Sequence, residues 1–311
     1  MSLACLPISG MQPGGGSVKF LPFLCTVFGA ATVAAAQPLV DAPCGSVRGV
    51  ETHGAQAFLG IPYGETTSGA NRWRPPRPKR PWPGIRDCTK YGPICPQESK
   101  TSLASGGASE DCLNLNVWTP RTVSRPLPVM VWIHGGAFVS GAGSLPIYEG
   151  ASLALRGVVV VTLNYRLGVL GFLAHPELTA EGQGESGNYG VLDVIEALRW
   201  VQTNIRSFGG DPARVTVFGQ SAGAALIRVL LVSPVARGLF QRAILESGPA
   251  GQLPYLQRSV SYLPSAESFG STFAERVLGP GLARTSALRR LRETPVRDLL
   301  AAMGGRQNFL D

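Results

Sequence analysis

Short apolar runs alternate with helical patterns along the chain from residue 113 onward. Three of these runs are almost uninterrupted, which is typical of strands that are covered on both faces of a sheet. We expect buried strands at residues 113–118, 129–134, 158–164, 215–219 and 242–246. Residues 189–208 place apolar side chains at helical spacing, which predicts a helix that packs on the sheet. The alternation predicts an α/β fold with an open, mostly parallel central sheet and helices on both faces.

The pattern is different on either side of this region. Residues 45–50 and 56–61 are alternating runs around a glycine-containing turn, which predicts a hairpin, and a proline-rich stretch follows to about residue 97. Residues 209–212 (Gly-Gly-Asp-Pro) predict a glycine stop for the long helix and then a tight turn. Residues 260–303 predict three helices with polar faces.

The first 36 residues have the features of a secretory signal peptide. Lys19 is followed by an apolar run and by the small residues Ala34, Ala35 and Ala36. A membrane anchor is the alternative, but the run is short for a bilayer and ends mostly in Ala, Gly and Thr. We therefore expect residues 1–36 to be removed, with no stable membrane insertion afterwards. The domain of residues 37–311 would then be secreted, periplasmic or extracellular.

The composition indicates a globular domain and argues against nucleic acid as a binding partner. The 311 residues carry a formal charge of +8, with 44% apolar and 15% charged side chains, which argues against disorder. Arginine supplies most of the positive charge, with 24 Arg against 4 Lys. The densest basic stretch, residues 72–80, is interleaved with proline and is interpreted as an extended surface segment. Because the charges are scattered, we expect no binding of nucleic acid.

Cleavage of the signal would leave four cysteines, namely Cys44, Cys88, Cys95 and Cys112. An even number in an exported chain favours disulfides over metal or redox chemistry. Three pairings are possible. Cys95 with Cys112 closes a short loop rich in Ser, Gly and Ala and is the preferred bridge, which leaves Cys44 with Cys88. No spacing resembles a zinc site, and neither a metal nor a cofactor is expected.

The strongest chemical signal is Gly-Gln-Ser-Ala-Gly at residues 219–223. It directly follows one predicted strand and directly precedes an apolar helix at residues 224–232, which is the context of a nucleophile elbow. The flanking glycines allow a sharp turn that holds Ser221 in a strained conformation. Ser221 is therefore the candidate nucleophile, placed at a helix N-terminus where developing negative charge is favoured.

A second motif follows the predicted strand at residues 129–134. Residues 134–138 read His-Gly-Gly-Ala-Phe, and consecutive glycines let backbone amides turn towards one point. Attack on an ester carbonyl creates an oxyanion that needs such preorganised donors. We expect Gly135, Gly136 and Ala222 to form an oxyanion hole. His134 precedes this loop and is expected to orient it rather than to act as the catalytic base.

These and other motifs resemble the type-B carboxylesterase family, which includes the cholinesterases. The matching segments are residues 58–63, 110–118, 134–138, 164–172, 187–190, 208–212 and 219–223. The resemblance runs from about residue 38 to 311. It implies an α/β-hydrolase fold and hydrolysis of small carboxylic esters through an acyl-enzyme on Ser221. It also supports the Cys95–Cys112 bridge.

Two departures from the family narrow the expected substrate. Gln220 stands where the family usually has a glutamate, which removes a negative charge beside the nucleophile. Residues 96–111 contain no aromatic residue, whereas cholinesterases have a cation-binding tryptophan in the matching loop. A quaternary ammonium would find neither a ring face nor a carboxylate. Neutral esters are therefore expected in place of choline esters.

Histidine is scarce, and its positions affect the expected mechanism. Only His53, His134 and His175 occur, and none follows Ser221. In this fold the order along the chain is serine, then an acid, then histidine. We therefore expect this chain to be the N-terminal portion of a longer esterase. This portion would lack the C-terminal strands of the sheet and the acid and base of the catalytic triad. The alternative is a catalytically inactive, esterase-like domain used for secreted binding or adhesion.

Overall fold

The computed structural model describes residues 37–98, 106–249, 254–260, 262–279, 281 and 286–304. Contacts within the chain group residues 37–311 into one compact unit. The signal segment itself lies outside the described residues. Among those described, no helix combines the length and apolar character needed to cross a membrane.

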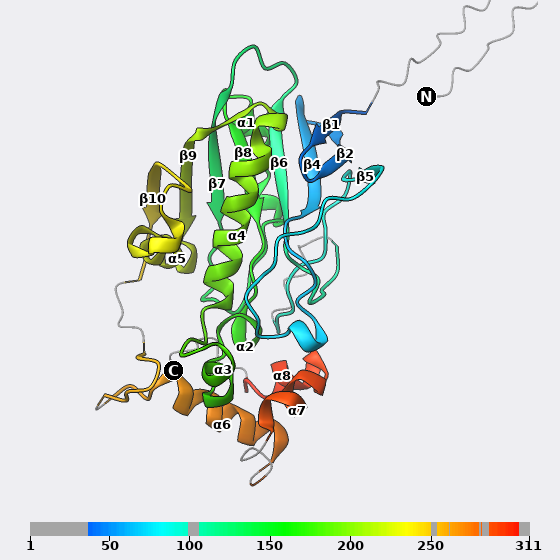
Figure 1. Ribbon diagram of the computed structural model, residues 1–311. Coiled ribbons are helices and arrows are strands. Elements are labelled where there is room, and N and C mark those ends of the chain that lie inside the picture. Colours follow the sequence, from blue (N-terminus) through cyan, green and yellow to red (C-terminus); the bar gives the residue numbers. More distant parts are fainter. Residues whose placement is uncertain are drawn as a thin grey trace, which may run out of the picture. The chain divides into compact units, whose positions relative to one another are not determined.

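The central sheet has seven strands in the order β10-β9-β7-β8-β6-β4-β3 (Figure 1). Their bounds are β3 Val50–Thr52, β4 Ala55–Pro62, β6 Asn114–Pro120, β7 Leu127–Ile133, β8 Val159–Leu163, β9 Gly210–Gln220 and β10 Arg242–Glu246. All five predicted strands are present. Strands β10, β9, β7 and β8 run parallel, whereas β6, β4 and β3 continue the sheet in antiparallel pairs. The parallel arrangement therefore holds for the half that carries Ser221, and the strand predicted at residues 113–118 is antiparallel to its neighbours.

A hairpin forms near the N-terminus of the domain, but its first strand is not the predicted one. Strands β3 and β4 pair through a turn at His53 and Gly54, both with positive φ, of 46° and 84°. Two successive turn residues with positive φ give the backbone the twist that a tight hairpin requires. Residues 45–48 instead belong to a separate sheet of β1 Leu39–Ala42, β2 Gly45–Arg48 and β5 Ile85–Asp87.

Helices cover both faces of the central sheet. The α-helices are α1 Ala151–Ala154, α2 Gly168–Phe172, α3 Pro176–Glu181, α4 Tyr189–Asn204, α5 Ala222–Val232, α6 Ala266–Leu278, α7 Ala287–Glu293 and α8 Val296–Ala301. Side chains of a strand alternate between its faces, so Val159 and Val161 of β8 pack in the cluster that contains α4 and α5. Val160 packs on the opposite side with Trp118 and the α1 residue Ala151. Figure 1 shows α4 lying along the sheet.

The end of the long helix differs in detail from its prediction. Helix α4 ends at Asn204, and a short 3₁₀ turn, Ile205–Phe208, continues to Gly209, whose φ of 82° stops the helix as expected. The tight turn expected next is instead part of β9, because Gly210 already pairs with Leu127. The register shifts beyond this pair, so the extra residues form an irregularity within the strand.

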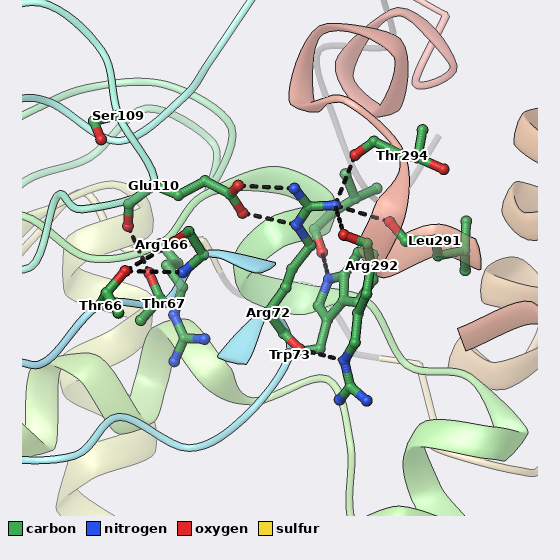
Figure 2. Close-up of polar contacts among 12 residues, drawn as sticks. Thr66, Thr67, Arg72, Trp73, Ser109, Glu110, Arg166, Leu291, Arg292 and Thr294 are labelled. Atoms are coloured by element: carbon green, nitrogen blue, oxygen red, sulfur yellow. Dashed lines mark hydrogen bonds and ion pairs between the residues drawn. The ribbon is translucent and has the colours of Figure 1, made fainter. Parts of the chain in front are cut away.

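The three predicted C-terminal helices are α6, α7 and α8, which pack with α2 in a second apolar cluster. Arg72 fixes this group to the sheet domain, as Figure 2 shows. Its Nε and Nη2 bind both carboxylate oxygens of Glu110 at 2.7 and 2.8 Å. Its Nη1 donates to the carbonyls of Leu291 and Thr294 at 2.8 Å each and of Arg292 at 3.2 Å. One guanidinium therefore neutralises a carboxylate and satisfies the C-terminal carbonyls of α7.

The interpretation of residues 72–80 as a surface segment is consequently wrong at its beginning. Arg72 and Trp73 are 5% and 2% exposed, and the Trp73 Nε1 donates to the carbonyl of Val169 at 2.7 Å. The basic side chain is buried because its partners come from distant parts of the chain. Arg74 and the residues that follow are largely exposed.

The structure confirms one disulfide prediction and contradicts the other. Cys95 and Cys112 are bonded, with their Cα atoms 4.9 Å apart. Cys44 and Cys88 are free buried thiols. They lie at opposite ends of the parallel β2–β5 pair, because Cys44 precedes β2 and Cys88 follows β5. Burial raises the pKa of Cys44 to about 11 and that of Cys88 to about 12, so both thiols remain protonated at neutral pH.

Candidate active site

Ser221 occupies a strained turn between β9 and α5. Its φ of 55° and ψ of −119° lie outside the regions that L-residues ordinarily adopt. Its amide donates to the carbonyl of Glu246 at the end of β10 at 2.9 Å. Its carbonyl accepts the amide of Ala225 in the first turn of α5 at 3.0 Å. The neighbouring strand and the helix thus hold the turn from both sides.

The two glycines of the motif are required by the close approach of β7. A Cβ on Gly223 would lie 2.0 Å from the carbonyl oxygen of Ile133, and a Cβ on Gly219 would lie 2.7 Å from the same atom. Both distances are shorter than any real contact. The glycines therefore allow the elbow to pack against the end of the central strand.

The loop after β7 reaches Ser221 as the sequence predicts. A Cβ on Gly135 would lie 3.2 Å from the Cβ of Ser221 and 2.7 Å from the carbonyl oxygen of Gln220. Gly136, Ala137 and Phe138 then have positive φ values of 114°, 52° and 62°. Three successive residues with positive φ turn the backbone sharply beside Ser221.

The amides of Gly135, Gly136 and Ala222 donate no hydrogen bond to any residue in the described part of the chain. Ala222 is the first residue of α5, where the amides of the first turn have no partner within the helix. The positive end of the helix dipole adds to the effect of these free donors. The structure therefore places Ser221 beside the predicted oxyanion-hole residues, in an arrangement that can stabilise a negatively charged oxygen.

His134 is buried behind this loop. Its Nδ1 lies 2.8 Å from the carbonyl oxygen of Gly135, and its ring stacks on Tyr165 with a centroid distance of 4.4 Å. The Tyr165 hydroxyl donates to the His134 carbonyl at 2.9 Å. Burial lowers the pKa of His134 to about 4, so the imidazole is neutral at pH 7. Its position fits the predicted role of orienting the loop.

Gln97 is a positioning residue that the sequence did not reveal. Its side-chain amide donates to the Gly141 carbonyl at 2.9 Å, and its Oε1 accepts the Gly141 amide, also at 2.9 Å. Gly141 in turn packs on His134, since a Cβ there would lie 2.5 Å from Nδ1. Gln97 also donates to the carbonyl of Cys95 in the disulfide. A glutamine in a proline-rich loop carries no sequence signal for this contact.

The remaining histidines have contacts away from Ser221. His175 accepts the amide of Glu177 at 3.2 Å and thereby caps α3. His53 lies in the β3–β4 turn, with Nδ1 3.9 Å from Glu149. Within the described residues, no group of three or more His, Cys, Asp or Glu side chains is placed to hold a metal ion.

The sequence of the chain is similar to those of known proteins. The sequence model of the carboxylesterase family matches residues 36–309. Fumonisin B1 esterase of Sphingopyxis macrogoltabida is 50% identical over 230 residues, which cover 73% of this chain and 41% of that protein. Para-nitrobenzyl esterase of Bacillus subtilis (strain 168) is 50% identical over 215 residues, which cover 68% of this chain and 43% of that protein. The chain thus spans about two fifths of the length of these relatives.

Solved structures agree with the sequence comparison. A structure titled PNB esterase superposes with a TM-score of 0.76 at 45% identity, covering 87% of this chain and 54% of that chain. A carboxylesterase of Geobacillus stearothermophilus, EST55, gives a TM-score of 0.75 at 39% identity and covers 88% and 56%. The matched region amounts to about half of each solved chain.

Proposed function

The chain belongs to the carboxylesterase family and has an α/β-hydrolase fold, and from this premise we propose that Ser221 is the nucleophile of a carboxylic ester hydrolase. Its Oγ attacks the ester carbonyl carbon and gives up its proton to a general base, and the carbonyl oxygen becomes an oxyanion. Collapse of this intermediate breaks the bond to the alkoxide, which receives that proton and leaves as the alcohol, and an acyl group remains on Ser221. Water then releases the carboxylic acid and restores the hydroxyl.

One observation carries this proposal. The strained turn of Ser221 lies against a loop and a helix terminus that offer free amides. Gly135, Gly136 and Ala222 donate to the oxyanion, which is stronger than a neutral carbonyl as a hydrogen-bond acceptor. Such donors stabilise the transition state more than the substrate, and removing a single one typically lowers kcat by about 10²–10³. A turn with only a structural role would require neither the strain nor the free donors.

The three histidines do not supply a general base to Ser221. His134 is neutral and fixed behind the loop, His175 caps α3, and His53 lies in the β3–β4 turn. We place the nucleophile and the oxyanion donors in this chain, and the triad base and acid outside these 311 residues. Serine acylation in this chain is therefore slow, because no imidazole removes the Oγ proton.

The substrate is a neutral ester. Gln220 puts an uncharged amide beside the nucleophile, with its Oε1 close to Gly135. Without a carboxylate at this position, or an aromatic ring in residues 96–111, a choline group gains no favourable contact. A neutral alcohol group needs no cation-binding partner, so the absence of these side chains does not disfavour it.

Export is part of the proposal. Residues 1–36 act as a cleaved signal, and the domain works outside the cytoplasm. The Cys95–Cys112 bond supports this location, since disulfides persist mainly in oxidising compartments.

Acylation by p-nitrophenyl acetate tests the proposed chemistry. Peptide mapping by mass spectrometry should find the acetyl group on Ser221 in preference to exposed serines such as Ser207. The Ser221→Ala variant should lose this product, and multiple turnover should be the same in both proteins. Acetylation of Ser221 no faster than Ser207 would contradict its role as nucleophile. Serine-dependent turnover would contradict the placement of the base outside this chain.

The positions of the three histidines also favour a second candidate, an inactive esterase-like domain for secreted binding or adhesion. A binding domain needs no reactive serine, so it predicts equal acetylation of Ser221 and Ser207. Equal rates would therefore favour this candidate over the hydrolase.

A further inference from the structure

Strand β10 forms one edge of the central sheet and pairs with β9 alone among the strands that the structure describes (Figure 1). Its sequence is Arg-Ala-Ile-Leu-Glu, and every residue except Ala243 is exposed. Ile244 and Leu245 are 44% and 42% exposed. An edge strand of this kind presents unpaired backbone groups and apolar side chains to another chain.

The hydrogen bonding to β9 shows which backbone groups of β10 face outward. The Glu246 carbonyl accepts the amide of Ser221, which directly follows β9, so the backbone of Glu246 points towards β9. Successive residues of a strand point their backbone groups to opposite sides, so Ile244 also bonds to β9. The N–H and C=O groups of Ala243 and Leu245 therefore face the open edge and are available to a further strand.

The sequence of β10 is complementary to itself in the antiparallel direction. When two copies are aligned about Ile244, Arg242 lies directly opposite Glu246 of the other copy, and Ala243 lies opposite Leu245. The Ala243–Leu245 pairs are then the hydrogen-bonded ones, as their outward backbone groups require. The Arg242–Glu246 pairs are of the non-hydrogen-bonded kind, in which the side chains approach most closely. A shift of two residues would keep the backbone pairing but would separate the opposite charges.

The two charged residues of β10 lack partners of their own. Neither Arg242 nor Glu246 forms an ion pair or a side-chain hydrogen bond with any residue that the structure describes. Within one copy they are about 13 Å apart along the strand, with Ile244 between them. The antiparallel register brings each of them next to an opposite charge, and two-fold symmetry forms the same ion pair at both ends of the strand pair.

Helix α5 extends the exposed apolar surface beside this edge. Ala243 packs against the apolar cluster that contains the α5 residues, so α5 covers the face of β10 that carries Ala243. The last residues of the helix, Leu231 and Val232, are 55% and 80% exposed, and Val235 in the following turn is 55% exposed. An antiparallel strand pair has its two-fold axis perpendicular to the sheet. Both copies of α5 would therefore lie on the same face of the joined sheet and add apolar surface beside the strands.

We propose that β10 pairs with β10 of a second copy of this chain, antiparallel and about a two-fold axis at Ile244. The two central sheets join into one continuous sheet through the backbone groups of Ala243 and Leu245, and Arg242 forms an ion pair with Glu246 of the other copy. A second copy fits this edge because the strand matches itself in charge and in backbone direction. The interface does not depend on ester chemistry.

Charge reversal, measured by sedimentation velocity, tests this register. The unaltered chain should change from monomer to dimer as its concentration rises. Arg242→Glu and Glu246→Arg each place like charges opposite one another at both ends of the strand pair. Each should therefore raise the dissociation constant of the dimer by about tenfold or more. The matched control is Arg289→Glu, at an exposed position of α7, which should dimerise like the unaltered chain.

Mixing the two charge variants distinguishes this interface from any other. A chain with Arg242→Glu and a chain with Glu246→Arg have opposite charges at every facing position, so they should form a mixed dimer although each associates poorly alone. The double variant Arg242→Glu/Glu246→Arg should dimerise like the unaltered chain, which also shows that the single variants did not merely unfold. Dimers that persist in both single variants, or a mixture that stays monomeric, would overturn the proposal. An unaltered chain that is monomeric at every concentration would also overturn it and would favour a different polypeptide at this edge.

Discussion

Replacing Arg72 by methionine should release the C-terminal helices from the sheet domain. The substitution keeps an apolar stem of similar length and removes five hydrogen bonds, two to Glu110 and three to carbonyls near the end of α7. The Arg74→Met variant is the matched control. Arg74 is also paired, with Glu181 at 3.2 Å, but its side chain is 51% exposed.

Burial sets the expected size of the difference. The side chains of Arg72 and Glu110 are 6% and 12% exposed, so methionine would leave a nearly buried carboxylate without its partner. Breaking a buried pair in this way costs about 3–5 kcal/mol, whereas an exposed pair contributes about 0–1 kcal/mol. Because α6, α7 and α8 have their own apolar cluster, we expect most of the loss to appear locally.

Hydrogen exchange measured by mass spectrometry distinguishes local from global loss. Peptides that cover Ala287–Glu293 should exchange about 10²–10³-fold faster in Arg72→Met, while peptides from β7 and β9 should change little. Arg74→Met should leave both regions close to the wild type. Equal effects of the two substitutions, or equal acceleration in α7 and β7, would refute the reasoning that Arg72 attaches these helices.

Three further predictions concern the site and its supports. Gly223→Ala places a Cβ 2.0 Å from the Ile133 carbonyl oxygen and should abolish selective acetylation of Ser221, whereas Ser207 should react as before. Removing the Cys95–Cys112 bond by a double alanine substitution should lower the free energy of unfolding by about 3 kcal/mol in urea titrations, since the bond closes a loop with a sequence separation of 17. For His134, the folded pKa of about 4 lies below the ordinary value of 6.5, so protons bind preferentially to the unfolded chain between these values. Its contribution of about 3 kcal/mol is complete above pH 6.5 and is lost as the pH falls to 4, and the His134→Asn variant should lack this part of the pH dependence.

The candidate site could be predicted from the sequence because its geometry depends on short motifs. Gly219 and Gly223 must be glycine to pass the end of β7, and Gly135 must be glycine to approach Ser221. A strained turn that admits only these residues leaves a recognisable pattern. The strands and the long helix were predictable for a similar reason, since the periodicity of burial follows directly from local geometry.

Features that depend on contacts between distant residues were not predictable. Arg72 lies in a basic, proline-rich segment, and the carbonyls that bury it are 219 to 222 positions away. Apolar runs also carry no information about strand direction, so the antiparallel pairing of β6 was missed. The predicted Cys44–Cys88 disulfide is wrong because the parallel register of β2 and β5 places the two cysteines at opposite ends of the strand pair. Cysteine spacing does not reveal this register.

Elements within this chain hold the turn at Ser221. The geometry of this turn therefore does not depend on the group that would accept the Oγ proton. The Glu246 carbonyl holds the amide of Ser221, Ile133 packs on both glycines, and the His134 loop is held by Gln97. None of these contacts involves a group that accepts the Oγ proton. The strain at Ser221 is therefore maintained by the packing of β7, β9, β10 and α5, and in the proposed function it orients the Ser221 hydroxyl towards the free amides. An added base would thus act on a site whose geometry already exists.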